Sequence, residues 1–354
     1  MFLKSIGAND DVIRAFEPYI SQGLDLARVA ESQCDRYRLL TEAGERNGVP
    51  SGRLRYRAED SASLPAAGDW VAARFLDSRE ALVEAVLPRR SAFSRRAAGT
   101  RAEEQVVAAN IDRLFVVCGL DGDFNLRRIE RYLTLAAAGG VNPVIVLNKA
   151  DLCANVSERA AETRTAAGAA PVLAVSARTG AGLETLRTYL NSGETVALVG
   201  SSGAGKSTLI NWLLGADRQR TGEVRESDSR GRHTTTHREL VPIPGGGALI
   251  DTPGLRELQL WAERDSVESV FGEVAELAAR CRFRDCTHTG EPGCAVEEAL
   301  RSGDLASDRL ASFQKLIREA QRHEEESDPL AAQQRKSKVK VMHRALRRHP
   351  KYKR

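Results

Sequence analysis

Glycine, lysine and serine stand in a phosphate-binding spacing in the segment Gly200–Ser207, which reads G-S-S-G-A-G-K-S. The apolar run Val196–Val199 precedes the segment, and an apolar helical pattern follows it as far as Leu214. Glycines let backbone N–H groups converge on phosphates, and the start of the following helix adds partial positive charge. Lys206 is expected to contact the β- and γ-phosphates, and the Ser207 hydroxyl to bind Mg²⁺. Strand, loop and helix together predict a nucleoside triphosphate site.

A second polar segment, Asn148-Lys149-Ala150-Asp151, follows the apolar run Val144–Leu147. A carboxylate only accepts hydrogen bonds, and guanine presents N1–H and its 2-amino group as adjacent donors where adenine presents neither. We therefore predict that Asp151 reads guanine, while Asn148 holds the loop and the stem of Lys149 covers the base. Ser176-Ala177 follows the next predicted strand, where a backbone N–H can reach guanine O6. GTP is thus favoured over ATP. The residues predicted to bind the nucleotide are Asn148, Lys149, Asp151, Ser176, Ala177, Gly200, Ser201, Ser202, Gly203, Ala204, Gly205, Lys206, Ser207 and Thr208.

The segment Asp251-Thr252-Pro253-Gly254 follows a third apolar run. We expect Asp251 to hold Mg²⁺ through water and the N–H of Gly254 to sense the γ-phosphate. A threonine upstream completes the Mg²⁺ shell; Thr236 is the first candidate, and Thr235 is left open. Leu255 has no hydrogen-bonding side chain to orient the attacking water, so His233 or a partner group is expected to do this. The predicted catalytic residues are Lys206, Thr236, Asp251, Gly254 and His233, and the predicted magnesium ligands are Ser207, Thr236 and Asp251.

Three cysteines and a histidine crowd into a short polar segment as Cys281-x4-Cys286-x-His288-x5-Cys294. Three thiolates and one imidazole suit a closed tetrahedral Zn²⁺ site, which leaves no open position for a catalytic water. A buried thiol cluster and a redox pair are the alternatives. The first is disfavoured because charged residues stand between the cysteines. We predict one structural zinc ion held by Cys281, Cys286, His288 and Cys294.

The elements that must position these residues read as an α/β sheet. Apolar runs at Ile111–Val117, Val144–Leu147, Val172–Val175, Val196–Val199 and Ala248–Ile250 alternate with helical patterns, notably at Leu126–Ala138 and Leu183–Leu190. Such alternation predicts a mostly parallel sheet with both faces covered. Ligands in these sheets lie at the carboxyl ends of the strands, which is where the phosphate loop falls.

Residues 35–97 have a different texture, with short β-like runs separated by turn-forming residues. This spacing predicts a small antiparallel barrel, and an OB-fold is the first choice. One predicted strand, Leu54–Tyr56, places Arg53, Arg55 and Arg57 on a common face. That face is either a nucleic-acid surface or a solvated strand face. Residues 1–34 show weak helical patterning without assignable chemistry, and residues 88–99 read as a basic linker.

Length, cysteine content and charge limit the number of domains, the compartment and the kind of partner that we expect. A chain of 354 residues is expected to form two or three domains. No apolar run reaches the roughly 20 residues of a membrane span, and the N-terminus lacks a secretory signal, so the cytoplasm is the expected compartment. Six cysteines over this length do not form a disulfide framework. No acidic residue follows Asp328, while basic residues accumulate; this tail is either an arm for RNA or a solubilising segment.

The order of the motifs is unusual, because the guanine-reading NKAD precedes the phosphate loop. With the barrel before them and the cysteine cluster behind, the chain resembles the circularly permuted GTPases of the RsgA/YjeQ family from about residue 35 to 320. The segment Gly68-Asp69-Trp70-Val71 is also similar to a stretch of that family's barrel. The resemblance implies a GTPase for late maturation of the small (30S) ribosomal subunit, which binds 16S rRNA and is stimulated by the subunit. The cysteine spacing also matches the family's zinc-binding domain.

The expected organisation has four parts: an extension at 1–34, an OB-fold RNA-binding barrel at 35–97, a circularly permuted GTPase domain at 98–270, and a zinc-binding domain with helices and the basic tail at 271–354. A monomer is expected. Two other functions stay open. One is a permuted GTPase that acts on tRNA or the large subunit, and the other is an RNA-binding scaffold with GTP as a structural ligand.

Overall fold

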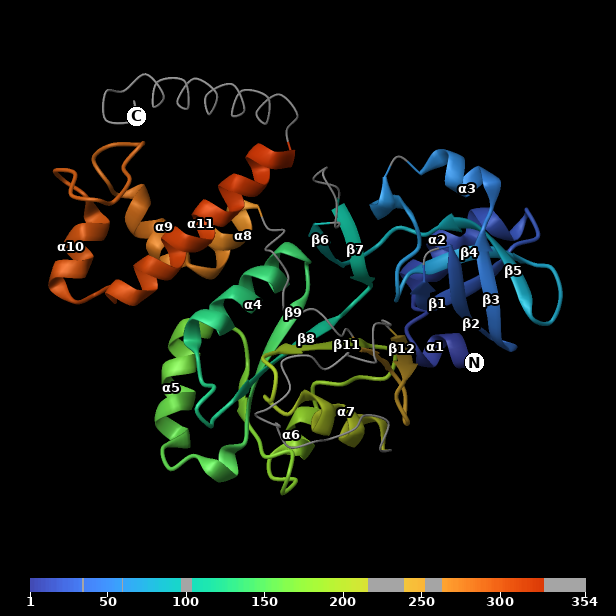
Figure 1. The fold of residues 1–354 in the computed structure, drawn as a ribbon, viewed down its shortest axis with the longest axis horizontal. Coiled ribbons are helices and arrows are strands. Elements are labelled where there is room, and N and C mark those ends of the chain that lie inside the picture. Colours follow the sequence, from blue (N-terminus) through green and yellow to red (C-terminus); the bar gives the residue numbers. More distant parts are fainter. Residues whose placement is uncertain (34, 59, 97–103, 216–238, 252–262, 328–354) are drawn as a thin grey trace, which may run out of the picture. The chain divides into compact units, whose positions relative to one another are not determined.

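The computed structural model describes residues 1–33, 35–58, 60–96, 104–215, 239–251 and 263–327 (Figure 1). The described residues up to 251 belong to one compact unit, and residues 263–327 belong to a second. No helix among these residues has the length and apolar character needed to cross a membrane.

Five strands form a closed barrel near the N-terminus, after the helices α1 (Phe2–Ser5) and α2 (Asp10–Ile20). The strands are β1 (Asp25–Gln33), β2 (Arg36–Thr41), β3 (Gly44–Pro50), β4 (Trp70–Phe75) and β5 (Glu80–Val86). They pair in the order β1-β2-β3-β5-β4, and β4 pairs back to β1. All pairs are antiparallel except β3 with β5. The predicted barrel is confirmed, and its first strand lies before residue 35 in the stretch interpreted as weakly helical.

The prediction of a strand at Leu54–Tyr56 is wrong, because these residues lie in the helix α3 (Gly52–Arg57). The Ser51 hydroxyl caps the helix by accepting a hydrogen bond from the N–H of Leu54 at 3.0 Å. Leu54 then packs into the barrel core. Arg53, Arg55 and Arg57 therefore do not share a strand face. Helical spacing puts Arg53 and Arg57 on one side and Arg55 on another.

The predicted basic linker at 88–99 is also wrong in part. Strand β6 (Ala92–Arg96) begins within it and pairs with β7 (Glu104–Ala109) as an antiparallel two-stranded sheet. An isolated bridge between Ala67 and Ala108 connects β7 to the loop that precedes β4. The described residues 92–96 and 104–109 therefore form a paired connection between the barrel and the next sheet.

The predicted parallel sheet is confirmed. Its strands are β8 (Arg113–Gly119), β9 (Asn142–Asn148), β10 (Val172–Ala174), β11 (Thr195–Gly200), β12 (Glu239–Pro242) and β13 (Ala248–Asp251), in the order β10-β9-β8-β11-β13-β12. Its helices are α4 (Leu126–Ala138), α5 (Val156–Ala167), α6 (Leu183–Arg187) and α7 (Lys206–Leu214). Helices α6 and α7 pack on one face, and Figure 1 shows α4 and α5 on the other. Only β12, which the sequence did not reveal, runs antiparallel to its neighbour.

Strand β12 also joins this sheet to the barrel. Glu239 of β12 is paired in register with Glu31 of β1, so one sheet of 11 strands runs through both parts. The guanidinium of Arg38 lies 3.6 Å from the Glu31 carboxylate and 2.6 Å from that of Glu239. This cation offsets the repulsion between two like charges that face each other across strands.

A buried guanidinium forms a second connection. Arg28 of β1 is 1% exposed. Its N–H groups donate to the carbonyl oxygens of Ile6, Gly68 (3.2 Å) and Asn110 (3.3 Å) and to the Thr195 hydroxyl (2.8 Å). Burial lowers its pKa to about 9, so it stays charged at neutral pH. The N-terminal segment, the barrel and the first residue of β11 thus share one donor group.

The second unit consists of the helices α8 (Arg264–Val270), α9 (Gly272–Ala279), α10 (Ala295–Ser302) and α11 (Ser307–Ser327). The rings of Phe271 and Phe313 pack with centroids 5.6 Å apart. Arg309 covers the Phe271 ring at 4.0 Å, and its Nε lies 2.6 Å from the Glu273 carboxylate. The segment between α9 and α10 carries the predicted metal ligands.

Arg28 provides a test of the connection between the barrel and the sheet. We predict that Arg28→Met lowers the free energy of unfolding by about 3 kcal/mol or more, because several buried acceptors lose their donor. Arg55→Met is the matched control; it removes one exposed ion pair and should cost less than about 1 kcal/mol. Urea unfolding followed by tryptophan fluorescence measures both. Equal losses in the two variants would contradict the role of Arg28.

Candidate nucleotide site and metal centre

The predicted phosphate loop connects the end of β11 to the start of α7. Gly200 and Gly205 have φ of 148° and 92°. A Cβ on Gly200 would lie 2.1 Å from the carbonyl oxygen of Val117 in β8, so a larger residue does not fit there. The ammonium of Lys206 donates to the carbonyl oxygens of Gly200 (2.8 Å) and Ser201. The lysine side chain thus lies over the loop, where it is predicted to contact the phosphates of the nucleotide.

Asn148, the last residue of β9, joins three predicted segments. Its Nδ2 donates to the carbonyl oxygen of Ala204 in the phosphate loop at 2.8 Å. Its Oδ1 accepts from the N–H of Ala177 at 2.9 Å. The side chain is 2% exposed, and a Cβ on Gly205 would lie 2.1 Å from Nδ2. The structure therefore brings together loops that are far apart in the chain, and Asn148 uses both ends of its amide to hold them.

Asp151 lies beside the Ser176 turn. The hydroxyl of Ser176 donates to Oδ1 of Asp151 at 2.6 Å, and Nε of Arg178 lies 3.4 Å from Oδ2. The Ser176 hydrogen bond is the main cause that lowers the pKa of Asp151. The group is an ionised acceptor with its orientation fixed, as the guanine prediction requires.

Sequence reasoning missed Asp121, which follows the end of β8. Lys149 has a left-handed backbone with φ of 63°, and its ammonium pairs with the Asp121 carboxylate. A Cβ on Gly119 would lie 2.6 Å from Oδ1 of Asp121, so a larger residue there would displace this carboxylate. Burial alone would raise the pKa of Asp121, but the bond from Lys149 outweighs it and lowers the pKa. This pair fixes the lysine that is predicted to cover the base.

Asp123 was missed as well, and it acts on the phosphate loop. Its carboxylate accepts from the Ser201 hydroxyl and lies 2.7 Å from Nη1 of Arg128. The signal that could have found both aspartates is their position. They follow the carboxyl end of a central strand, at the edge where ligands bind in parallel sheets.

The predicted magnesium and catalytic residues are described only in part. Ser207 lies in the first turn of α7, and Asp251 ends β13, which pairs with β11. Both therefore lie at the carboxyl edge of the sheet, together with the phosphate loop. Thr235, Thr236, His233, Gly254 and Leu255 fall outside the described residues, so their roles stay predictions.

The four predicted zinc ligands converge. One donor atom from each of Cys281, Cys286, His288 and Cys294 lies within 4.8 Å of all the others. His288 Nδ1 is 3.6 Å from Cys281 Sγ and 3.5 Å from Cys294 Sγ, and these two sulfur atoms are 3.9 Å apart. A tetrahedral Zn²⁺ with bonds of about 2.0–2.3 Å separates its ligands by about 3.5–3.8 Å. The donor set and its spacing fit zinc.

Protonation equilibria in the cluster also fit a cation. Burial lowers the pKa of His288, so its ring is neutral and can act as a ligand. Burial would raise the pKa of Cys281, but the N–H groups at the start of α10 outweigh it and lower the pKa. Burial and the neighbouring thiols raise the pKa of Cys286 to about 12. Three sulfur atoms this close do not all ionise unless a cation neutralises them.

Glu291 organises the segment between the ligands. Its carboxylate accepts from the N–H groups of Thr287 (2.9 Å) and Thr289 (2.7 Å) and from the Thr287 hydroxyl. These bonds lower its pKa to about 2, with the Thr287 hydroxyl as the main cause. His288 lies between the two threonines with φ of 59°, so the carboxylate stabilises the turn that presents this ligand.

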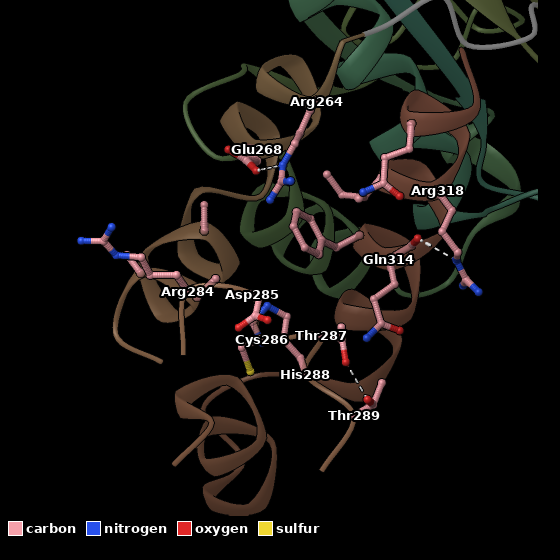
Figure 2. Close-up of a pocket in the computed structure, with 16 residues that line it drawn as sticks. Arg264, Glu268, Arg284, Asp285, Cys286, Thr287, His288, Thr289, Gln314 and Arg318 are labelled. Atoms are coloured by element: carbon pink, nitrogen blue, oxygen red, sulfur yellow. Dashed lines mark hydrogen bonds and ion pairs between the residues drawn. The ribbon is translucent and has the colours of Figure 1, made fainter. Parts of the chain in front are cut away.

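A cavity of about 730 Å³ borders the metal ligands within the second unit. Figure 2 shows Cys286 and His288 on one wall and Gln314 of α11 facing them, while the guanidinium groups of Arg284 and Arg318 point away. At the other end of the cavity Nε of Arg264 pairs with Glu268 at 2.6 Å. Two of the four ligands are therefore accessible from the cavity and are not enclosed in a core.

Comparison with known proteins agrees with this arrangement. A sequence profile of the family described as RsgA GTPase matches residues 86–261. The small ribosomal subunit biogenesis GTPase RsgA of Opitutus terrae is 48% identical and covers 98% of this chain and 97% of its own length. The protein of that name from Leptospira interrogans is 41% identical, with coverages of 96% and 94%.

Solved structures show the same fold. YjeQ from Thermotoga maritima matches with a TM-score of 0.63 and 26% identity, covering 84% of this chain and 98% of that one. YloQ, described as a circularly permuted GTPase, matches with a TM-score of 0.60 at 22% identity, covering 84% and 95%. The chain belongs to the RsgA GTPase family.

Proposed function

We propose that this protein hydrolyses GTP as an assembly factor in late maturation of the small (30S) ribosomal subunit. Relatives that match along nearly the whole chain carry the name small ribosomal subunit biogenesis GTPase. The observation that carries the proposal is the pair of hydrogen bonds of Asn148, to Ala204 and from Ala177. They hold together the segments that are proposed to bind the guanine nucleotide, which follow one another in permuted chain order.

One set of residues is proposed to bind the guanine base, and another set to bind the phosphates. The fixed carboxylate of Asp151 accepts from guanine N1–H and the 2-amino group, and Lys149, anchored by Asp121, covers the base. Loop N–H groups and Lys206 receive the phosphates. Ser207, Asp251 and Thr236 would hold Mg²⁺, which neutralises charge on the β- and γ-phosphates. Orienting the attacking water falls to His233 or to a group of the subunit.

Other parts of the chain serve the ribosomal partner. The barrel and the basic tail are proposed to bind 16S rRNA, with one Zn²⁺ holding the second unit in the conformation that binds the subunit. The protein is proposed to act as a cytoplasmic monomer. Because Leu255 cannot orient water, hydrolysis by the free protein should be slow.

The function is tested by measuring GTP hydrolysis by the protein alone, with purified small subunits and with large subunits. We expect small subunits to raise turnover by about tenfold or more, which corresponds to about 1.4 kcal/mol in the barrier. ATP should not replace GTP. Equal stimulation by large subunits would refute the small-subunit assignment, and a preference for ATP would refute the guanine site.

The Lys149–Asp121 pair makes a separate prediction. Asp121→Asn should raise KM for GTP about fivefold and leave kcat with saturating GTP unchanged, because a half-exposed ion pair that positions the base is lost. Asp35→Asn is the matched control; it removes the carboxylate paired with Arg55 on the barrel. Steady-state kinetics with saturating small subunits separate the two constants. An unchanged KM would show that Asp121 does not position Lys149.

The zinc site is tested through Glu291. We expect one zinc ion per chain and a roughly tenfold lower zinc affinity in Glu291→Gln, measured by competition with a chromogenic chelator. Glu298→Gln, in the first turn of α10, is the control. Because folding lowers the pKa of Glu291 from 4.5 to about 2, its contribution is complete above pH 4.5 and is lost as pH falls toward 2. Unaltered affinity at neutral pH would argue against this role.

A further inference from the structure

Helix α3 presents an unusual combination of side chains on one face. Arg53, Tyr56 and Arg57 are spaced i, i+3 and i+4, which places them side by side on a helix. Tyr56 is 91% exposed, and Leu54 is the one α3 residue that is buried. Tyr56 therefore contributes almost nothing to the barrel core.

The other aromatic rings of the barrel are covered. Tyr37 and Trp70 are buried, and the guanidinium of Arg46 covers the Phe75 ring at 4.2 Å. A single exposed apolar side chain is ordinary and needs no explanation. The feature that distinguishes Tyr56 is the pair of exposed arginines on the same face of the helix, with Arg53 between the ring and Arg57.

The two arginines differ in how they are held. Nη2 of Arg53 lies 3.5 Å from the carboxylate of Glu84, whose side chain is 13% exposed, so this guanidinium is oriented by the barrel. Arg57 is exposed, and no carboxylate among the described residues forms an ion pair with it. Arg55, on another side of the helix, is paired with Asp35. The face around Tyr56 thus carries more positive charge than the side of Arg55.

The helix is anchored to the barrel despite its length. The N–H of Ser51 donates to the carbonyl oxygen of Val83 in β5 at 2.9 Å, and the N–H of Ala58 donates to that of Leu54 at 3.0 Å. With the cap on Ser51, these contacts hold the backbone on both sides of Tyr56. The ring therefore projects from a fixed position.

An exposed ring beside two guanidinium groups suits a nucleotide. The π-face of a tyrosine stacks on any base, and the arginines next to it receive the phosphates. We propose that Arg53, Tyr56 and Arg57 form a stacking site for an unpaired nucleotide of single-stranded RNA. The proposal rests on the proposed function in taking that RNA as part of the small subunit. In Figure 1 α3 lies on the outside of the barrel.

The test uses the full chain and a single-stranded RNA 12-mer with 2-aminopurine at one position, because the fluorescence of this base is quenched when it stacks. The wild type should quench it, and so should Tyr56→Trp. Tyr56→Ala should abolish the quenching and weaken binding about tenfold. Leu76→Ala, another exposed apolar residue of the barrel, is the control and should behave as wild type. Quenching by Tyr56→Ala equal to that of the wild type would overturn the proposal.

Charge is tested on the same probe. Arg53→Gln with Arg57→Gln should lower the slope of log affinity against log salt by about 1.4, as expected for two phosphate contacts with a single strand. Arg55→Gln, the same substitution at one position on another side of the helix, should leave the slope nearly unchanged. Equal slopes in the two variants would contradict the assigned face. Thermal unfolding verifies that every variant is folded.

Stimulation of hydrolysis by small subunits, measured beside quenching, distinguishes a failure of the stacking site from a failure of the proposed function. If wild-type hydrolysis is stimulated by small subunits but Tyr56→Ala leaves quenching intact, the stacking site is wrong and the function stands. If quenching depends on Tyr56 but small subunits do not stimulate hydrolysis, the function is wrong and the site stands. Weaker subunit binding by Tyr56→Ala with unaltered quenching would indicate a ribosomal protein partner and would overturn the RNA site.

Discussion

The buried guanidinium of Arg28 is the contact on which the first unit depends. A charge in this position is tolerated because every nitrogen of the guanidinium donates to an acceptor, since an unpaired buried cation is very costly. Its acceptors come from the N-terminal segment, the barrel and β11, and the Trp70 ring lies 5.0 Å from it. Strand β11 begins at Thr195 and ends at Gly200. The barrel and the phosphate loop are thus attached to opposite ends of one buried strand.

The nucleotide site shows why chain order matters little to such a protein. Asn148 contacts Ala204 across 56 residues, and Ser201 contacts Asp123 across 78. The contacting residues lie on or next to strands that are adjacent in the sheet, in the order β9-β8-β11. Strands can be adjacent in a sheet whatever their order in the chain. In this permuted chain the loops still meet at the carboxyl edge of the sheet. Binding requires the loops to lie close together, and the buried side chain of Asn148 holds them there by hydrogen bonds to Ala204 and Ala177.

Long periodic segments were predictable from the sequence. The helix expected at Leu126–Ala138 has those bounds, and apolar runs located five of the six strands in the second sheet. Helix α3 was missed because the alternation in Arg-Leu-Arg-Tyr is typical of a strand. The Ser51 side chain instead caps a helix that begins at the next residue. Asp121 and Asp123 were missed because their partners are 28 and 78 residues away in the chain, and their position after a central strand is the one local signal that marks them. The zinc ligands were found because they lie within one short segment.

The pairing of β12 with β1 limits how this protein can be divided. Strand β12 pairs with β13 along its whole length, and its first residue, Glu239, also pairs with Glu31 of the barrel. A shortened chain that lacks the barrel would expose the N–H and C=O groups at that end of β12. Bare strand edges recruit other chains into intermolecular sheets. We therefore expect the barrel to shield the Glu239 end of this strand from such pairing, besides any contact it makes with RNA.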